Sequence, residues 1–166
     1  MKTDKIYLVG FMAAGKSTVG KALAHRLQWA FRDLDELIEE REQLSVADFF
    51  SEKGEAAFRK AEATMLKEIQ QLRHAVVATG GGTFERPSNR TIISDDGVVV
   101  WLDIPIETAL SRLSGDPTRP LGSNPNRLRS LWARRRSTYS LAQVQLTTEG
   151  KTVEDLVTRI VNWISE

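Results

Sequence analysis

The residues best suited to chemistry stand near the N-terminus, in the run Gly10-Phe11-Met12-Ala13-Ala14-Gly15-Lys16-Ser17. This run fits G-x-x-x-x-G-K-[ST], a pattern whose backbone N–H groups bind phosphate oxygens at the start of a helix. Lys16 is suited to bridge the outer phosphates, and the Ser17 hydroxyl is suited to ligate Mg²⁺. At average glycine usage, chance produces such a run in roughly one chain in a hundred. The run therefore predicts a loop that binds ATP or GTP.

Two carboxylates follow this loop in the segment Phe31-Arg32-Asp33-Leu34-Asp35. On an extended backbone Asp33 and Asp35 point to the same side. One could hold the Mg²⁺ shell, while the other accepts a proton from a hydroxyl or orients it. The alternative is that they cap the helix expected at residues 36–41, a role that suits aspartate. The preceding phosphate loop favours the catalytic alternative.

Short apolar runs alternate with amphipathic segments along the chain. Residues 6–9, 75–78 and 98–102 have the continuous apolar pattern of strands buried on both faces, and residues 30–31 and 144–146 are weaker strand candidates. Helical patterns cover residues 16–28, 55–72, 106–113 and 153–164, the last with a start signal at Thr152 and Asp155. This alternation predicts a three-layer α/β fold with a mainly parallel, five-stranded central sheet and ligands at the carboxyl ends of its strands.

Two loop regions are candidates for function. Gly80, Gly81 and Gly82 follow a buried strand and leave backbone amides bare for a small polar ligand, although a triple glycine is usually only a turn. Residues 114–126 are rich in glycine, proline, serine and asparagine and have no helical or strand period. Such a loop within a compact domain predicts a lid over a site, and the alternative is a surface insertion.

The stretch from Arg112 to Tyr139 holds seven arginines, no lysine and one acidic residue. Arginine suits bidentate recognition of carboxylate and phosphate groups. The alternative is a solvated basic helix face, which would include Arg127, Arg129 and at least one of residues 134–136. A nucleic-acid surface is less favoured, because few aromatic residues are interleaved with the arginines.

The ordered set of motifs resembles the shikimate kinase family over essentially the whole chain, from Ile6 to the last helix. The matching positions are the phosphate loop, Asp33-x-Asp35, Phe58-Arg59, Gly80-Gly81-Gly82, Arg119-Pro120-Leu121 and the Arg135…Tyr139 segment. The resemblance implies a P-loop kinase fold in one domain spanning residues 1–166, with a lid at about 114–126. It also implies phosphoryl transfer from MgATP to the 3-hydroxyl of shikimate, a step of aromatic amino acid biosynthesis.

The resemblance further implies roles for single residues on the acceptor side. Asp35 resembles the residue that contacts the shikimate hydroxyls and acts as base or orienter. Arg59 and Arg135 resemble the arginines that bind the shikimate carboxylate, although Ser137 stands where the family has proline and Arg136 could then substitute. The expected substrate-binding residues are Asp35, Phe49, Phe58, Arg59, Gly80, Gly81, Gly82 and Arg135.

On the donor side, the resemblance implies Mg²⁺ as cofactor, with Ser17 and Asp33 near the metal. Arg119 resembles a lid arginine that reaches the ATP phosphates, and Arg112 resembles an arginine that packs on adenine. Gly122 departs from the family pattern, in which the lid continues with leucine. The expected ATP-binding residues are Gly10, Ala13, Ala14, Gly15, Lys16, Ser17, Thr18, Arg112 and Arg119, and the expected catalytic residues are Lys16, Asp35 and Arg119.

Composition limits the other classes. The 166 residues carry a formal net charge of +1 and no cysteine, so they give no case for nucleic-acid or membrane partners and exclude disulfides and thiolate metal sites. We expect a cytoplasmic monomer, since no apolar run reaches the roughly 18 residues of a membrane span. The remaining alternatives are a gluconate or nucleoside-monophosphate kinase and a catalytically silent relative. A switch GTPase is disfavoured, because no Asn-Lys-x-Asp segment is present.

Overall fold

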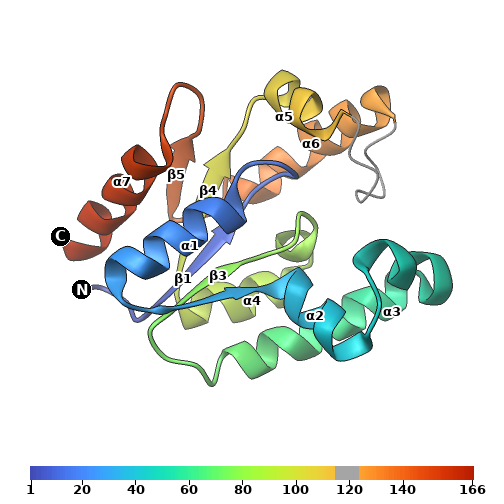
Figure 1. Cartoon of the computed structure of the whole chain (residues 1–166), viewed down its shortest axis with the longest axis horizontal. Helices are drawn as coiled ribbons and strands as arrows, with labels where there is room; N and C mark the ends of the chain where they lie inside the picture. The colour runs from blue at the N-terminus through green and yellow to red at the C-terminus, as the bar shows by residue number, and fades with distance from the viewer. Residues whose placement is uncertain (115–123) are drawn as a thin grey trace.

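The computed structural model describes residues 1–114 and 124–166, which form a central sheet covered by helices (Figure 1). The sheet has the strand order β2-β3-β1-β4-β5, and every pair of neighbouring strands is parallel. The prediction of a five-stranded parallel sheet is therefore confirmed. The strands are β1 (Lys5–Val9), β2 (Ala30–Asp33), β3 (Ala75–Ala78), β4 (Val98–Asp103) and β5 (Val144–Thr147).

Seven α-helices and one 3₁₀ turn connect or follow these strands in the described part of the chain. Of these helices, none is both long and apolar enough to cross a membrane. They are α1 (Lys16–Leu27), α2 (Leu34–Glu42), α3 (Val46–Ile69), η1 (Thr83–Glu85), α4 (Pro87–Asp96), α5 (Ile106–Leu113), α6 (Pro125–Tyr139) and α7 (Val153–Ser165).

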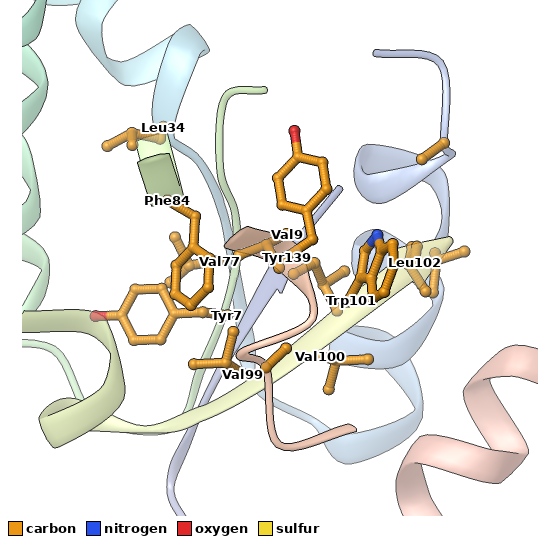
Figure 2. Packing of buried hydrophobic residues seen from close by; sticks show 14 of the residues in the cluster. Tyr7, Val9, Leu34, Val77, Phe84, Val99, Val100, Trp101, Leu102 and Tyr139 are labelled. Atoms are coloured by element: carbon orange, nitrogen blue, oxygen red, sulfur yellow. The ribbon is translucent and has the colours of Figure 1, made fainter. Parts of the chain in front are cut away.

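The three central strands, β1, β3 and β4, are buried on both faces because their side chains alternate between two helical layers. Leu8 of β1 points toward α1, where it lies close to Gly20, and α1 packs beside α7. The neighbouring Tyr7 points the other way and donates a hydrogen bond to Asp96 of α4, which packs with α3. Figure 2 shows the resulting core, in which Tyr7, Val77 and Val99 lie together. The continuous apolar runs of the sequence are explained by this two-sided burial.

Several helix boundaries differ from those expected. Helix α3 begins at Val46, because the Ser45 hydroxyl accepts a hydrogen bond from Asp48 N, and Gly54 interrupts it with φ 85° and ψ 170°. Helix α6 begins at Pro125 after an Asn124 cap, so the last two residues of the expected lid are helical. Residues 115–123 of that lid lie outside the described residues. The start of α7 matches the sequence, since Thr152 and Asp155 form the reciprocal cap expected of them.

Lys5 makes a buried polar cluster at the amino edge of the sheet, the edge opposite the phosphate loop. Its side chain is 1% exposed, and Nζ lies 2.7 Å from Asp96 Oδ2 and 3.0 Å from the carbonyl oxygen of Ile69. It thereby joins β1 to the ends of α3 and α4. Burial and the nearby Asp96 carboxylate raise the pKa of Tyr7, so the tyrosine hydroxyl stays protonated and donates to the same carboxylate.

We predict that Lys5→Met lowers the free energy of unfolding by about 3 kcal/mol, because Asp96 and two carbonyl groups lose a buried charged donor. Catalytic activity below the unfolding transition should be unchanged, since the cluster is at the far edge of the sheet. Urea unfolding and steady-state rates measure the two effects. Lys67→Met, at an exposed position of α3, is the matched control and should change stability by less than about 0.5 kcal/mol. Equal stabilities of the two variants would contradict the prediction.

Candidate active site

The phosphate-binding run forms a loop between β1 and α1 at the carboxyl edge of the sheet. Gly10 has φ 150° and packs so closely on β4 that a Cβ there would lie 2.6 Å from the carbonyl oxygen of Leu102. Gly15, with φ 92°, is the N-cap of α1 and brings no capping side chain. No capping side chain therefore competes with an anion for the first turn of α1. Ala13 has φ 64°, a left-handed conformation that a non-glycine residue adopts only at a cost.

Two cationic side chains contact this loop. Lys16 Nζ donates to the carbonyl oxygens of Gly10 at 2.7 Å and Phe11 at 2.9 Å. Arg112, near the end of α5, donates from Nη1 to the carbonyl oxygen of Ala13 at 2.8 Å. Both side chains are thus within reach of a group bound by the loop.

The remaining expected phosphate-binding residues have different positions. Ala14 is buried within the loop, and Thr18 is exposed in the first turn of α1, next to Ser17. Arg119 and Gly122 lie outside the described residues.

Ser17 and Asp33 meet across the strand–helix junctions of β1–α1 and β2–α2. The Ser17 hydroxyl donates to Asp33 Oδ2 at 2.6 Å, and Asp33 Oδ1 accepts from Glu36 N as the N-cap of α2. Asp33 therefore combines the two alternatives left open by the sequence, because it caps a helix and faces the phosphate loop.

The oxygen atoms of Ser17 and Asp33 fit Mg²⁺ held jointly with phosphate oxygens. Mg²⁺ is usually bound through one or two carboxylates plus substrate phosphates and water, without a dedicated all-protein cage. Residues 1–114 and 124–166 contain no cluster of three or more His, Cys, Asp or Glu side chains that could hold a metal by themselves.

Asp35 lies in the first turn of α2, so the expectation of an extended backbone through this residue is wrong. The residue as a whole is partly exposed, but its Oδ1 atom is buried and has no hydrogen-bond partner. Burial, and after it the nearby Asp33 and Glu62 carboxylates, raise the pKa of Asp35 to about 6 against the opposing charge of Lys16. An unpartnered, basic carboxylate oxygen is suited to accept a proton or a hydrogen bond from a ligand hydroxyl.

The run Gly80-Gly81-Gly82 brings three charged side chains together after β3. A Cβ on the first glycine would lie 2.9 Å from Asp35 Oδ1, and one on the second would lie 3.0 Å from Arg135 Nη1. A Cβ on the third would collide with the guanidinium of Arg59. Each glycine therefore leaves room for a different charged side chain. The sequence alone did not predict these three close contacts.

Arg59 is held in place by Glu62, one turn further along α3. Its Nη1 lies 3.1 Å from both carboxylate oxygens of Glu62, whose side chain is completely buried. Glu62 also accepts hydrogen bonds from Thr83 Oγ1 at 2.7 Å and from Asn89. Sequence reasoning missed Glu62, although its i, i+3 spacing from Arg59 is a signal for such a pair.

Arg135 and Arg136 occupy different environments on α6, which runs unbroken through Ser137. Arg135 is buried, reaches Gly81 and lies with Nε 3.1 Å from Glu85 Oε2, a partner that the sequence did not indicate. Arg136 is ion-paired with Asp103 at the end of β4. Only Arg135 of the two contacts the glycine run.

Phe49 and Phe58 lie on either side of the Gly54 interruption in α3. Both are buried, and their rings pack edge to face with centroids 5.6 Å apart. Phe58 adjoins Arg59 in sequence, and the guanidinium lies 5.4 Å from its ring. Phe58 therefore lies beside a charged group of the glycine run, and Phe49 packs behind it on the other side of Gly54.

Comparison with known proteins gives one consistent family. A family model described as shikimate kinase matches residues 12–165. The chain is 42% identical to the shikimate kinase of Sulfurihydrogenibium sp., over 93% of this chain and 96% of that one. It is 43% identical to the shikimate kinase of Geobacter sulfurreducens, over 97% of this chain and 91% of that one. It is also similar to the solved structure of shikimate kinase from Acinetobacter baumannii in complex with shikimate. The TM-score between the two structures is 0.93 and their sequences are 35% identical. The match covers 98% of this chain and 93% of the other.

Asp35→Asn is predicted to raise the free energy of unfolding at pH 8 by about 1–3 kcal/mol, because an ionised buried carboxylate is replaced by a neutral amide. The folded-state pKa of about 6 lies above the ordinary value of 3.8, so ionisation of Asp35 removes stability as the pH rises through this window. The advantage of the variant should therefore nearly vanish at pH 4. Urea unfolding at pH 4, 6 and 8 tests this, with the exposed Glu36→Gln as control. A variant no more stable than the parent at pH 8 would refute it.

Proposed function

The chain belongs to the shikimate kinase family, and we propose that it transfers the γ-phosphoryl group of MgATP to the 3-hydroxyl of shikimate, giving shikimate 3-phosphate and ADP. The observation that supports this most directly is the convergence of Asp35, Arg59 and Arg135 on the glycine run beside the phosphate loop. Two cations and one basic carboxylate match a small acceptor that carries both a carboxylate and hydroxyl groups.

On the acceptor side, Arg59 and Arg135 bind the shikimate carboxylate in this proposal. Their guanidinium groups lie against neighbouring glycines, and each is oriented by its own carboxylate partner, Glu62 or Glu85. Preorganised arginines lose little side-chain freedom on binding, which favours tight and oriented recognition of a planar carboxylate. The rings of Phe49 and Phe58 then provide apolar surface for the face of the substrate ring.

On the donor side, the N–H groups of residues 10–18 bind the ATP phosphates, and Lys16 donates to their outer oxygens. Arg112 packs at the loop on the adenine side, and Arg119 contributes a further positive charge by family resemblance alone. Ser17 and Asp33 would hold Mg²⁺, which when bound supplies neutralisation of the phosphate charge. The short distance between the Ser17 and Asp33 oxygens, 2.6 Å, supports a shared role for them.

Asp35 prepares the acceptor hydroxyl for transfer. Its raised pKa, about 6, leaves it ionised at neutral pH and still basic enough to take a proton. As the hydroxyl oxygen bonds to the γ-phosphorus, the bond from that phosphorus to the bridging oxygen of ADP breaks, and the hydroxyl proton passes to Asp35. The buried, unpartnered Oδ1 atom supports this assignment, because a substrate hydroxyl would satisfy it.

We predict that ADP release from MgATP depends on shikimate and that Asp35→Asn lowers kcat by roughly 10²- to 10⁴-fold, the range typical of lost general acid–base catalysis. A coupled assay with shikimate, gluconate, AMP and no acceptor measures both effects. Glu36→Gln removes a neighbouring exposed charge and should keep full activity.

The panel also separates the competing functions. ADP release that follows gluconate or AMP instead of shikimate would refute the proposed acceptor while leaving nucleotide binding intact. No release above the no-acceptor rate with any of the three would favour a catalytically silent relative.

Shikimate binding without nucleotide should weaken as the pH falls below about 6, because protonation of Asp35 replaces a charged hydrogen-bond acceptor for the substrate hydroxyl with a weaker, neutral one. The dissociation constant should rise by up to about tenfold per pH unit below that value. Calorimetric titration between pH 5 and 8 measures it. Asp35→Asn should bind more weakly at pH 8 and show no such dependence. A dissociation constant that stays constant in the parent protein would contradict the role given to Asp35.

A further inference from the structure

Arg136 lies in a small cluster of side chains at the end of α6, next to the site but outside it. Its two terminal nitrogens pair with the two oxygens of Asp103, one of them, Nη2 to Oδ2, at 3.1 Å. Its guanidinium carbon lies 5.0 Å from the ring centre of Trp101 and 4.7 Å from that of Trp132. We call these four residues the Arg136 cluster.

The Arg136 cluster is anchored to β4 and to the segment that follows it. Asp103 is the last residue of β4, and Trp101, only 4% exposed, belongs to the same strand. Trp132 belongs to α6 and donates from Nε1 to the carbonyl oxygen of Ile104 at 3.0 Å. Bidentate pairing combined with two ring faces holds a guanidinium far more firmly than a single surface ion pair does. The cluster therefore fixes the last two turns of α6 against the carboxyl end of β4.

The same turns of α6 carry the residues that reach the glycine run. Arg135 precedes Arg136 and lies against Gly81, and the Tyr139 hydroxyl donates to the carbonyl oxygen of Gly81 at 2.5 Å. Tyr139 also packs on Trp101, with ring centres 5.9 Å apart. The cluster and the site thus share one short piece of helix.

Rotation of α6 about its axis would displace Arg135 from the site. A helix with its side chains has a radius of about 5–6 Å, so a rotation of about 10° moves the end of a side chain by about 1 Å. A misplacement of that size is enough to weaken substrate recognition severely. The position of the Arg135 guanidinium consequently depends on whatever fixes the rotation of α6.

We propose that Arg136 is a positioning residue for the substrate carboxylate, in that its pairing with Asp103 and the two indoles sets the rotation of α6 and holds Arg135 at Gly81. This inference rests on the proposed role of Arg135 in binding that carboxylate. In this proposal Arg136 acts without contacting the substrate, since its guanidinium is directed at Asp103 and not at the glycine run.

The first test is steady-state kinetics of Arg136→Met, Arg136→Lys and Asp103→Asn. Arg136→Met should raise KM for shikimate by about tenfold, with kcat changed less than about twofold and KM for ATP unchanged, because only the carboxylate-binding arginine is displaced. Asp103→Asn should shift the same constant in the same direction, and Arg136→Lys should restore part of the loss. Arg127→Met removes an exposed arginine of the same helix and should leave all constants unchanged. Thermal unfolding of each variant ensures that rates are compared well below its transition.

The second test combines Arg136→Met with Arg135→Met. Because Arg136 acts through Arg135, the double variant should have the same KM for shikimate as Arg135→Met alone. Additive effects of the two substitutions would overturn the inference, since Arg136 would then act independently of Arg135. An unchanged KM in Arg136→Met, or a uniform loss of kcat without a KM effect, would overturn it equally.

The two proposals fail in different ways. If Arg135→Met leaves KM for shikimate unchanged, the carboxylate-binding role of Arg135 is wrong, and the inference about Arg136 falls with it. If Arg135→Met raises KM and Arg136→Met does not, only the inference about Arg136 is wrong.

Discussion

The close approach of charged side chains to the bare backbone of Gly80-Gly81-Gly82 is the contact on which the arrangement of the site depends. Asp35 comes from α2, Arg59 from α3 and Arg135 from α6, and each reaches a different glycine. Any Cβ on these residues would lie within about 3 Å of one of those groups. Three helices can therefore aim at one edge of the sheet only because β3 is followed by backbone without side chains.

The site brings two arginines close together, and each of them is paired with a carboxylate. Arg59 is paired with Glu62 and Arg135 with Glu85, so both arginines keep their orientation without a ligand. Asp35 is the exception, because burial and then its neighbours Asp33 and Glu62 raise its pKa, and no donor reaches its Oδ1 atom. Charge and hydrogen-bonding capacity left unsatisfied at this position destabilise the fold, and in the proposed function they provide an acceptor for the substrate hydroxyl group. The proposed function is therefore in direct tension with stability.

The arginines between Arg112 and Tyr139 make different contacts, although the sequence alone does not distinguish them. Arg112 contacts the phosphate loop, Arg135 the glycine run and Arg136 the end of β4, while Arg129 pairs with the exposed Glu107. An exposed basic helix face and a buried arginine at the glycine run, posed as alternatives by the sequence, are both present on α6. Position around the helix decides between them, since consecutive residues point about 100° apart.

The sequence by itself determined the features that depend on neighbours in the chain. Two-sided apolar runs specified the parallel sheet, and the glycine–lysine–serine spacing specified the phosphate loop, because both patterns operate over a few residues. Tertiary structure decided what depends on contacts between distant segments. It placed Asp35 in a helix beside Gly80, buried the Glu62 partner of Arg59 and joined that carboxylate to Thr83, and separated Arg135 from Arg136. Those outcomes depend on burial and on charges brought together across many tens of residues, quantities that no local spacing encodes.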